Sequence, residues 1–272
     1  MLRWPLDVGH NTIRIGPPEM IAPPHEIHHC AYIADGESVV CASHRDGQVL
    51  VFPTGHGDEP RRIGHHDAMS GLAVSPNNNW LATSTFKGTG VRVWDLRTGD
   101  LVEDLPVEGS ALIAISPGGE WLATSAGAEI ELWNTNTWKR RGRFSRSYPR
   151  FLPGPIAFSP NGRLFAFADS APPLKLTLVD LNTLEQLATL ECPEDIVIPV
   201  SMSFTPDGTR LVFPHPRQGN ILCIWDLRAV REQLKTMNLD WDLPPYPSAE
   251  LDVKSPQRLR VEIDLGMLAP GS

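Results

Sequence analysis

The stretches SPNNNWLATS (residues 75–84) and VRVWDLRTG (91–99) decide the fold, because both recur along the chain. Segments similar to the first begin at Ile33, Ser116, Ser159 and Thr205, so five consecutive starts lie 42, 41, 43 and 46 residues apart. Each is followed by a segment similar to the second, at 49–55, 130–137, 176–183 and 221–228. A repeat of this period is typical of folds built from stacked supersecondary units.

Each unit predicts four short antiparallel strands. An alternating apolar run leads into a turn that carries Asn-Gly, Asp-Gly or Gly-Gly, and such turns suit tight hairpins. A strand of small residues follows, then an alternating strand that ends in a large apolar residue, and then a more polar fourth strand. Four strands in about 43 residues is the period of a β-propeller blade, whose two apolar faces are buried by its neighbours.

The composition favours short elements in a soluble protein. The 26 prolines and 22 glycines among 272 residues disfavour long helices, while 41% hydrophobic residues are enough for a core. A net charge of −8 gives no general attraction to nucleic acid or anionic lipid. Pro5 and Asp7 interrupt any signal-peptide run, and no stretch of about 18 apolar residues could span a membrane. Four scattered cysteines indicate a reducing compartment, so we expect a cytoplasmic protein.

Several motifs resemble the WD40 repeat family: Trp94-Asp95, Trp225-Asp226, Gly64-His65, and the Ser-Pro turns at 75–76, 116–117 and 159–160. The resemblance covers roughly residues 2–228. It implies a buried tetrad in which a His, a Ser or Thr on the second strand, a turn Asp and the Trp are joined. The second repeat offers three of these four groups, and the first offers the turn Asp but has Phe52 in place of Trp. The residues expected to hold the repeats together are His65, Ser84, Trp94, Asp95, Asp46, Trp133, Trp225 and Asp226.

We therefore predict an all-β, WD40-like β-propeller of five recognisable blades plus a partial sixth, with a short C-terminal helix and tail. The blades are expected near 28–64, 65–106, 107–150, 151–195 and 196–228, with an N-terminal partial blade at 1–18. Residues 2–6 resemble the third strand of a blade, and 11–17 would be its fourth. Seven blades would need about 300 residues, more than the chain has.

The segment 229–272 is expected to hold a helix, a proline-rich linker and a strand. Val230, Leu234 and Met237 recur at helical spacing, Pro244-Pro245 end the helix, and residues 259–265 alternate as a strand does. In one interpretation, this strand and the N-terminal hairpin form a sixth blade that closes the ring. In the other, the chain is the C-terminal portion of a longer propeller. The tail resembles the segment after WD40 repeats in large bacterial multidomain proteins, many of which carry a Ser/Thr kinase.

Three motifs suggest chemistry, and each has a simpler explanation. His44-Arg45-Asp46 spells the kinase catalytic tripeptide, but Val51 replaces the required Asn, and Asp46-Gly47 suits a hairpin turn. Ser125 approximates a nucleophile elbow but ends a repeat strand. The densest set of possible metal ligands matches no known spacing and comprises His25, His28, His29, His65, His66 and Asp67. We predict no catalytic residue, cofactor or metal.

Six cations lie within twelve residues of this acidic chain: Lys139, Arg140, Arg141, Arg143, Arg146 and Arg150. They fall on the outer strand of the third repeat and the loop after it. Charge on an outer strand prevents edge-to-edge pairing of sheets. The alternative is a docking site for an acidic or phosphorylated partner, because arginine forks fit carboxylate and phosphate groups.

The family resemblance implies a non-catalytic protein–protein interaction scaffold. Its partners would be proteins or other domains of a longer parent protein, and neither nucleic acid nor a membrane. One alternative is a docking or sensor region of a bacterial Ser/Thr kinase-type multidomain system. Another is a propeller-fold hydrolase, which would need carboxylates or histidines that converge at the central channel.

Overall fold

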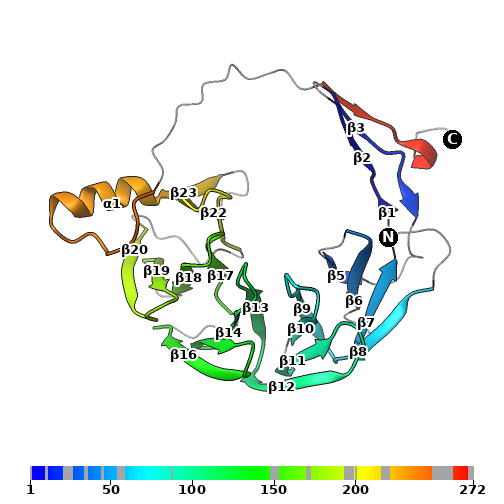
Figure 1. Cartoon of the computed structure of the whole chain (residues 1–272), viewed down its shortest axis with the longest axis horizontal. Coiled ribbons are helices and arrows are strands. Elements are labelled where there is room, and N and C mark those ends of the chain that lie inside the picture. The colour runs from blue at the N-terminus through cyan, green and yellow to red at the C-terminus, as the bar shows by residue number, and fades with distance from the viewer. Residues whose placement is uncertain are drawn as a thin grey trace.

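The computed structural model describes residues 2–9, 12–20, 27–33, 36–43, 46–53, 59–86, 88–147, 153–169, 173–192, 199, 201–215, 221–246 and 260–268. Five antiparallel sheets follow one another around an open arc, as Figure 1 shows. The first strand of each sheet lies toward the centre, and the fourth strand, where there is one, lies at the periphery. The all-β propeller predicted from the repeats is confirmed.

The strand bounds follow the repeats. The first blade has β5 (Ile27–Tyr32), β6 (Ser38–Ser43), β7 (Gln48–Pro53) and β8 (Arg61–His65). The second has β9 (Met69–Val74), β10 (Trp80–Thr85), β11 (Thr89–Asp95) and β12 (Leu101–Glu108). The third has β13 (Ala111–Ile115), β14 (Trp121–Ala126), β15 (Glu129–Asn134) and β16 (Lys139–Ser145). The fourth has β17 (Ile156–Phe158), β18 (Leu164–Asp169), β19 (Lys175–Asp180) and β20 (Gln186–Glu191), and the fifth has three strands, β21 (Ser203–Phe204), β22 (Arg210–Pro214) and β23 (Leu222–Asp226).

The Ser-Pro turns close the hairpin between the first and second strands of a blade. The hydroxyl of Ser75 accepts a hydrogen bond from the Trp80 backbone N–H at 3.0 Å. The Ser116 hydroxyl accepts a hydrogen bond from the Trp121 N–H in the same way, and the Thr205 hydroxyl accepts one from the Arg210 N–H at 3.1 Å. Four of the five repeats thus begin with a hydroxyl residue, because the turn uses it as a side-chain acceptor.

Adjacent blades pack through their sheet faces. One face of the first blade, with Val40 and Val49, packs against Met69, Leu81 and Trp94 of the second. The inner strands β5, β9, β13, β17 and β21 contact one another in that order. Successive side chains of a strand point to opposite faces of its sheet, so they contact the preceding and the following blade in turn. A blade that lies between two others is therefore buried on both faces.

The fifth blade ends in a helix where the other blades turn into a fourth strand. In the second, third and fourth blades, the residue four positions after the strand-end Asp95, Asn134 or Asp180 has a positive φ: 83° at Gly99, 52° at Trp138 and 61° at Leu184. The corresponding residue after Asp226 is Val230, and a β-branched residue disfavours positive φ. The chain continues as α1 (Leu227–Thr236), which Asp226 caps.

The helix and the residues after it form one packed unit. Val230 and Leu234 pack against the core shared by the fourth and fifth blades, as the helical spacing predicts. Met237, expected on the same face, is instead the C-cap and is 56% exposed, because the helix has ended before it. Trp241, four residues later, is buried in that core.

Arg231 on α1 connects the helix to the proline-rich segment. Its buried guanidinium donates to both carboxylate oxygens of Asp240, at 2.8 and 3.0 Å. It also donates to the carbonyl oxygens of Pro244, Leu243 and Trp241 at 2.6, 2.7 and 3.1 Å. One side chain therefore satisfies several carbonyl groups of a segment that has no regular structure.

Strands from the two ends of the chain share one sheet, here named the terminal sheet. It consists of β2 (Leu6–Val8), β3 (Thr12–Ile15) and β24 (Arg260–Ile263), with β24 parallel to β3. The N-terminal hairpin and the last strand are therefore joined in one sheet, while closure of the ring by this sheet stays a prediction. The short η1 (Gly266–Leu268) follows β24.

The strand predicted over residues 2–6 is divided. β1 (Leu2–Arg3) pairs with β4 (Glu19–Met20), and a separate strand, β2, begins at Leu6. Pro5 has no N–H and interrupts the ladder at this point. The prediction of one third strand here was therefore wrong, and the predicted domain boundary at residue 228 stays a prediction.

Candidate interaction surfaces

A buried hydrogen-bonded triad occupies the second blade. The indole Nε1 of Trp94 donates to Oγ1 of Thr83 at 3.0 Å, and Nδ1 of His66 lies 2.8 Å from the same hydroxyl. All three residues are less than a tenth exposed. The triad joins the loop before β9 to β10 and β11, so it fixes the geometry of the blade and is not open to a ligand.

Of the three residues predicted for this triad, Trp94 is a member, whereas His65 and Ser84 were each one position away. His65 is exposed and lies 3.4 Å from Asp67, while Ser84 faces the other side of β10, where its hydroxyl lies against Gly71. The physical reason is alternation: Trp94 is opposite Leu81, so Thr83, two residues from Leu81, shares its face and Ser84 does not.

The other blades keep parts of this arrangement. In the third blade, Nε1 of Trp133 donates to Oγ1 of Thr124 at 3.1 Å. In the fifth blade, Trp225 packs in the same cluster as Cys192 from the end of the fourth blade. Burial raises the pKa of the Cys192 thiol, and the Trp225 indole partly opposes the increase.

The aspartates of the repeats cap turns. Asp95 accepts hydrogen bonds from the backbone N–H groups of Arg97 and Thr98 at 2.9 and 2.7 Å, and the bond from Thr98 contributes most to lowering its pKa. Asp226 accepts from Arg228 in the same way and so begins α1. Asp46 accepts the Gln48 N–H at 3.2 Å in the β6–β7 turn. These carboxylates therefore stabilise turns and a helix start by accepting hydrogen bonds from backbone N–H groups.

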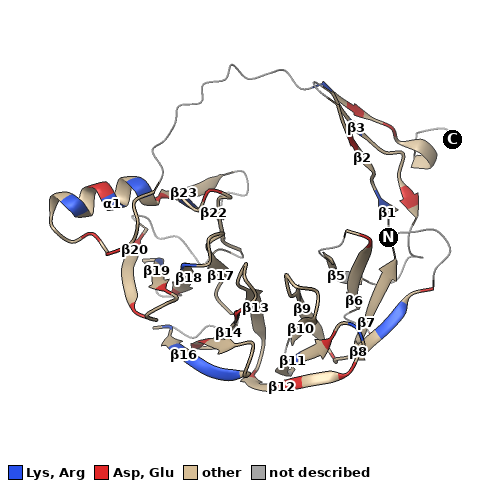
Figure 2. Ribbon diagram, viewed as in Figure 1, with Lys and Arg blue, Asp and Glu red and all other residues tan. Residues whose placement is uncertain are grey.

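Basic residues run along β16 on the outside of the arc, as Figure 2 shows. Arg140 forms an ion pair with Glu131 at 2.5 Å, and Arg143 forms one with Glu129 at 2.8 Å. The hydrogen bond to Glu129 is the largest cause of the raised pKa of Arg143. Lys139 and Arg141 are exposed on the same strand. Two of these cations therefore already have carboxylate partners within the blade.

One cation of the predicted docking set, Arg146, lies elsewhere. Arg146 is 3% exposed and donates to the Gly127 carbonyl oxygen at 2.9 Å, and the space above its guanidinium is filled by Gly154. A partner could not reach it, so its inclusion in a surface site was wrong. The error arose because Arg146 follows the exposed strand directly in sequence. Arg150 lies outside the described residues.

Two described residues of the motifs suggestive of chemistry, Ser125 and Asp46, are in structural positions. Ser125 lies within β14 and is fully buried, and Asp46 is the turn residue described above. His44, Arg45 and His25 lie outside the described residues. Among the residues that are described, no group of three His, Cys, Asp or Glu side chains is placed to hold a metal ion.

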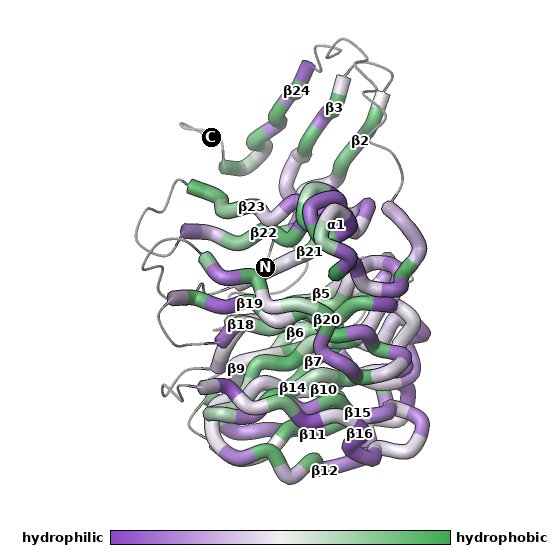
Figure 3. The backbone as a smooth tube through the Cα atoms, turned by 90° about the vertical axis from the view of Figure 1, so that its left-hand side faces the viewer, coloured by the Kyte–Doolittle hydropathy of each residue, from purple (hydrophilic) through white to green (hydrophobic). Residues whose placement is uncertain are grey.

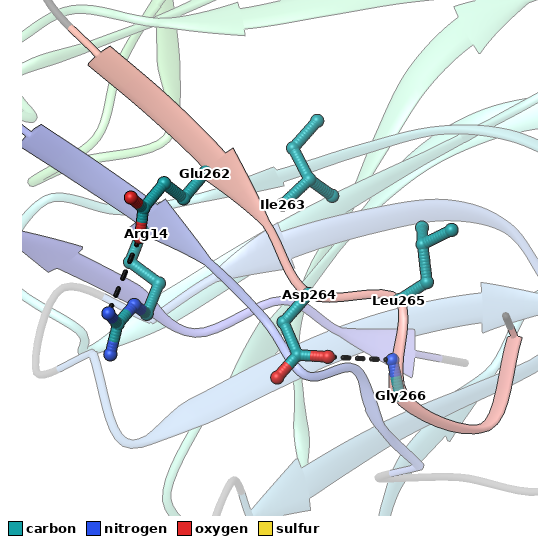
Figure 4. Close-up of a pocket in the computed structure, with 6 residues that line it drawn as sticks. All are labelled: Arg14, Glu262, Ile263, Asp264, Leu265 and Gly266. Atoms are coloured by element: carbon teal, nitrogen blue, oxygen red, sulfur yellow. Dashed lines mark hydrogen bonds and ion pairs between the residues drawn. The ribbon is translucent and has the colours of Figure 1, made fainter.

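A shallow depression lies at the end of the terminal sheet, and Figure 4 shows its lining. Arg14 forms an ion pair with Glu262 at 3.4 Å, and Asp264 accepts the Gly266 N–H at 3.0 Å. These polar groups interact with one another across the strand ends.

No helix in the described part of the chain is both long and apolar enough to cross a bilayer.

The terminal sheet has one apolar face and one charged face. The strand register places Leu6 opposite Ile15 and Val8 opposite Ile13, and it places Val261 and Ile263 beside the same two isoleucines. The exposed fractions of Val8 and Ile263 are 71% and 62%. Figure 3 shows apolar and polar residues alternating along these strands. A sheet normally buries such a face.

A second exposed apolar face lies at the other end of the arc, on the fifth blade. Leu211 and Phe213 point toward the fourth blade and are buried. The neighbouring positions point away from it: Val212 is opposite Ile224, and Pro214 is opposite Leu222. Leu222 and Ile224 are 64% and 57% exposed. β23 is also the edge strand of its sheet within the described residues. We call this surface the far face.

Residues 58–95 match the family model described as WD domain, G-beta repeat. This segment is a WD40 repeat. It contains the Trp94 triad and the Ser75 turn, so the WD40 resemblance read from these motifs is confirmed. The match ends at Asp95, the residue that caps the turn after β11.

Curated proteins match the same type of repeat over part of their length. The small ribosomal subunit protein RACK1z of Arabidopsis thaliana is 34% identical over 70 residues, which are 25% of this chain and 21% of that protein. Pre-mRNA-processing factor 19 of Schizosaccharomyces pombe is 31% identical over 75 residues, which are 27% of this chain and 15% of that protein. The matched segments thus span about a fifth of these relatives or less.

A solved structure, hydrazine synthase of Kuenenia stuttgartiensis, superposes with a TM-score of 0.62 at 14% identity. The likeness covers 75% of this chain and 64% of that chain. At this identity the chain shares only the fold with that enzyme. WD40-repeat proteins are typically interaction scaffolds, and that general role is what the WD40 relatives support here.

Proposed function

We propose that this chain is a non-catalytic protein-interaction scaffold and that its binding site is the far face of the fifth blade, with the terminal sheet on the other side of the opening. The observation that carries the proposal is the exposure of Leu222 and Ile224 on an edge strand. Exposed apolar surface of this kind marks sites of protein contact.

The chemistry of the occupant follows from the rest of the array. Every contact between successive blades joins two apolar sheet faces, and the far face is the next position in that series. A β-sheet from another polypeptide, with one apolar face, therefore suits it best. A strand of the partner can also pair with the outward N–H and C=O groups of β23 and extend the fifth sheet.

We propose that the protein acts in the cytoplasm.

The basic strand β16 is a weaker candidate site. Arg140 and Arg143 would have to leave Glu131 and Glu129 before they could bind an acidic partner. That exchange replaces one ion pair by another and gains little free energy at an exposed position. We therefore assign β16 to protection of the blade edge, with Lys139 and Arg141 as its solvated charges.

The test compares partner recovery for three tagged proteins isolated from their host cells. One is the unmodified chain. The second carries Leu222→Asp and Ile224→Asp on the far face, and the third carries Lys139→Glu and Arg141→Glu on β16. All substituted residues are exposed, so each variant is expected to fold. Circular dichroism and thermal unfolding verify this before recovery is compared.

We expect the far-face variant to lose about tenfold or more of the recovered partner, because two buried charges each oppose association. The β16 variant should recover it unchanged. Equal recovery by all three proteins would contradict the assignment of the site. Selective loss with the β16 variant would instead support docking of an acidic partner at that strand.

A further inference from the structure

Two cysteine thiols lie directly opposite each other in the first blade. Cys30 on β5 and Cys41 on β6 are register partners, and their Sγ atoms are 3.3 Å apart. Residues opposite each other in antiparallel strands have Cα atoms about 4.5–5.5 Å apart, within the range of about 4.4–6.8 Å that disulfides bridge. A disulfide bond of about 2.05 Å therefore needs only a small rotation of the side chains.

The two thiols differ in their access to solvent. Cys30 is exposed, whereas Cys41 is buried to 1% exposure beside Val39 and Phe52. Burial raises the pKa of the Cys41 thiol, and the neighbouring Cys30 raises it further. Cys30 is thus the thiol that an oxidant can reach, and Cys41 is the thiol that can resolve the product.

We propose that Cys30 and Cys41 form a reversible cross-strand disulfide that responds to hydrogen peroxide. The Cys30 thiolate attacks one peroxide oxygen, the O–O bond breaks, and Cys30 becomes a sulfenic acid. The departing hydroxide takes up the proton that the Cys30 thiol released and leaves as water. Sγ of Cys41 then attacks the sulfenic sulfur, the S–S bond forms, the S–O bond breaks, and a second water carries away the Cys41 proton. Two thiols are oxidised and one peroxide is reduced to two waters.

Reduction is expected to be slow with small thiols. A thiolate reductant can reach only Cys30, so Cys41 is the leaving group. A leaving thiol with a raised pKa departs slowly in thiol–disulfide exchange. The disulfide should therefore persist after a brief oxidation, even in a reducing compartment.

The position of the pair gives the bond a structural consequence. Cys41 lies on the face of the first blade that points away from the second blade, since Val40 and Ala42 on the other face form the contact. End units of repeat arrays open more readily than inner ones. A covalent link between β5 and β6 ties the inner strand of this end blade to its neighbour.

The experiment uses the full chain with Cys192→Ser and Cys223→Ser, so that Cys30 and Cys41 are its two remaining cysteines. After treatment with hydrogen peroxide, intact mass should fall by about 2 Da, and a peptide linked through residues 30 and 41 should appear. Amide exchange in β5 and β6 should slow about tenfold. Dithiothreitol should reverse both changes.

Two outcomes would overturn the proposal. One is full alkylation of both thiols after peroxide treatment. The other is a mass gain of about 32 Da at Cys30 with no link, which marks irreversible sulfinic acid formation. The variant that also carries Cys41→Ser serves as the control: it should accumulate the Cys30 sulfenic acid, trapped by dimedone, because the resolving thiol is absent.

Discussion

Nε1 of Trp94 lies 3.0 Å from Oγ1 of Thr83, and this hydroxyl is also 2.8 Å from Nδ1 of His66. One buried hydroxyl therefore holds the loop before β9 and the strands β10 and β11 in register. The blade geometry that displays the surface residues depends on such buried contacts.

Replacing Thr83 with alanine should lower the free energy of unfolding by about 1–3 kcal/mol, because the buried Trp94 indole and His66 ring lose their common partner. Ser84→Ala is the matched control on the next residue. The Ser84 hydroxyl is buried and has no hydrogen-bond partner among the described residues, so its removal should change stability by less than about 0.5 kcal/mol. Urea titration measures both, and a larger loss for Ser84→Ala would refute the triad.

Arg231→Lys should destabilise the unit of α1 and the segment after it by about 2–4 kcal/mol. An ammonium group cannot make the bidentate contact with Asp240 and reach the carbonyl oxygens of Leu243 and Pro244 as well. Gln233→Ala on the exposed side of the same helix should be nearly neutral. Limited proteolysis within residues 237–246 reports the difference. Equal cleavage of the two variants would show that Arg231 does not anchor the segment.

Gly99→Ala should cost more than Gly109→Ala, although both glycines have positive φ, 83° and 78°. A Cβ at Gly99 would lie 2.9 Å from the carbonyl oxygen of Ile63, whereas a Cβ at Gly109 meets nothing within 4 Å. Gly109→Ala should thus show backbone strain alone, about 1 kcal/mol, and Gly99→Ala should show about 1–2 kcal/mol beyond it. Thermal unfolding separates them. Similar losses would mean that the turn adjusts around Ile63.

The Asp207 carboxyl is expected to make the stability of the protein depend on pH. Hydrogen bonds from Thr205 and Thr209 lower its pKa from 3.8 to about 2. A depressed folded pKa gives stability that is fully present above pH 4 and is lost as the pH falls toward 2. Asp207→Asn should therefore be less stable than the unmodified chain at pH 7, by at most about 1 kcal/mol at this exposed site.

The difference between these two proteins should disappear near pH 2, where the Asp207 carboxyl is protonated. Asp100→Asn removes the same charge at another exposed turn, where the carboxylate accepts no hydrogen bond found among the described residues. Its effect on stability should be smaller at pH 7. A constant difference for Asp207→Asn between pH 7 and pH 2 would exclude the carboxylate as its cause.

The repeat allowed the fold to be predicted because its turns contain the residue types that a β-hairpin turn requires. Ser75 and Ser116 accept the bonds that a Ser-Pro turn needs, and Gly119 has the positive φ that its Gly-Gly turn requires. The helix after Asp226 was predicted from spacing alone. Its cause is local, because Val230 replaces the residue that elsewhere turns the chain back.

The errors had a physical cause as well. Choosing His65 and Ser84 over His66 and Thr83 was a shift of one residue, and in a strand that reverses the face of the side chain. Arg146 was grouped with surface cations although it is buried. Neither the pairing of Cys30 with Cys41 nor the far face could be predicted from the sequence, since both depend on strand register and on which face a neighbour covers.

The most direct test of the scaffold role places a photo-crosslinking amino acid at Ile224 or, as a control, at Arg141 in the chain expressed in its host cells. The far-face account predicts that position 224 crosslinks to a different polypeptide, and that position 141 does not. Crosslinks from 224 to residues 6–15 or 261–263 of the same chain would mean that the arc closes on its own terminal sheet. That result, or partner crosslinks at 141 alone, would contradict the proposed binding site.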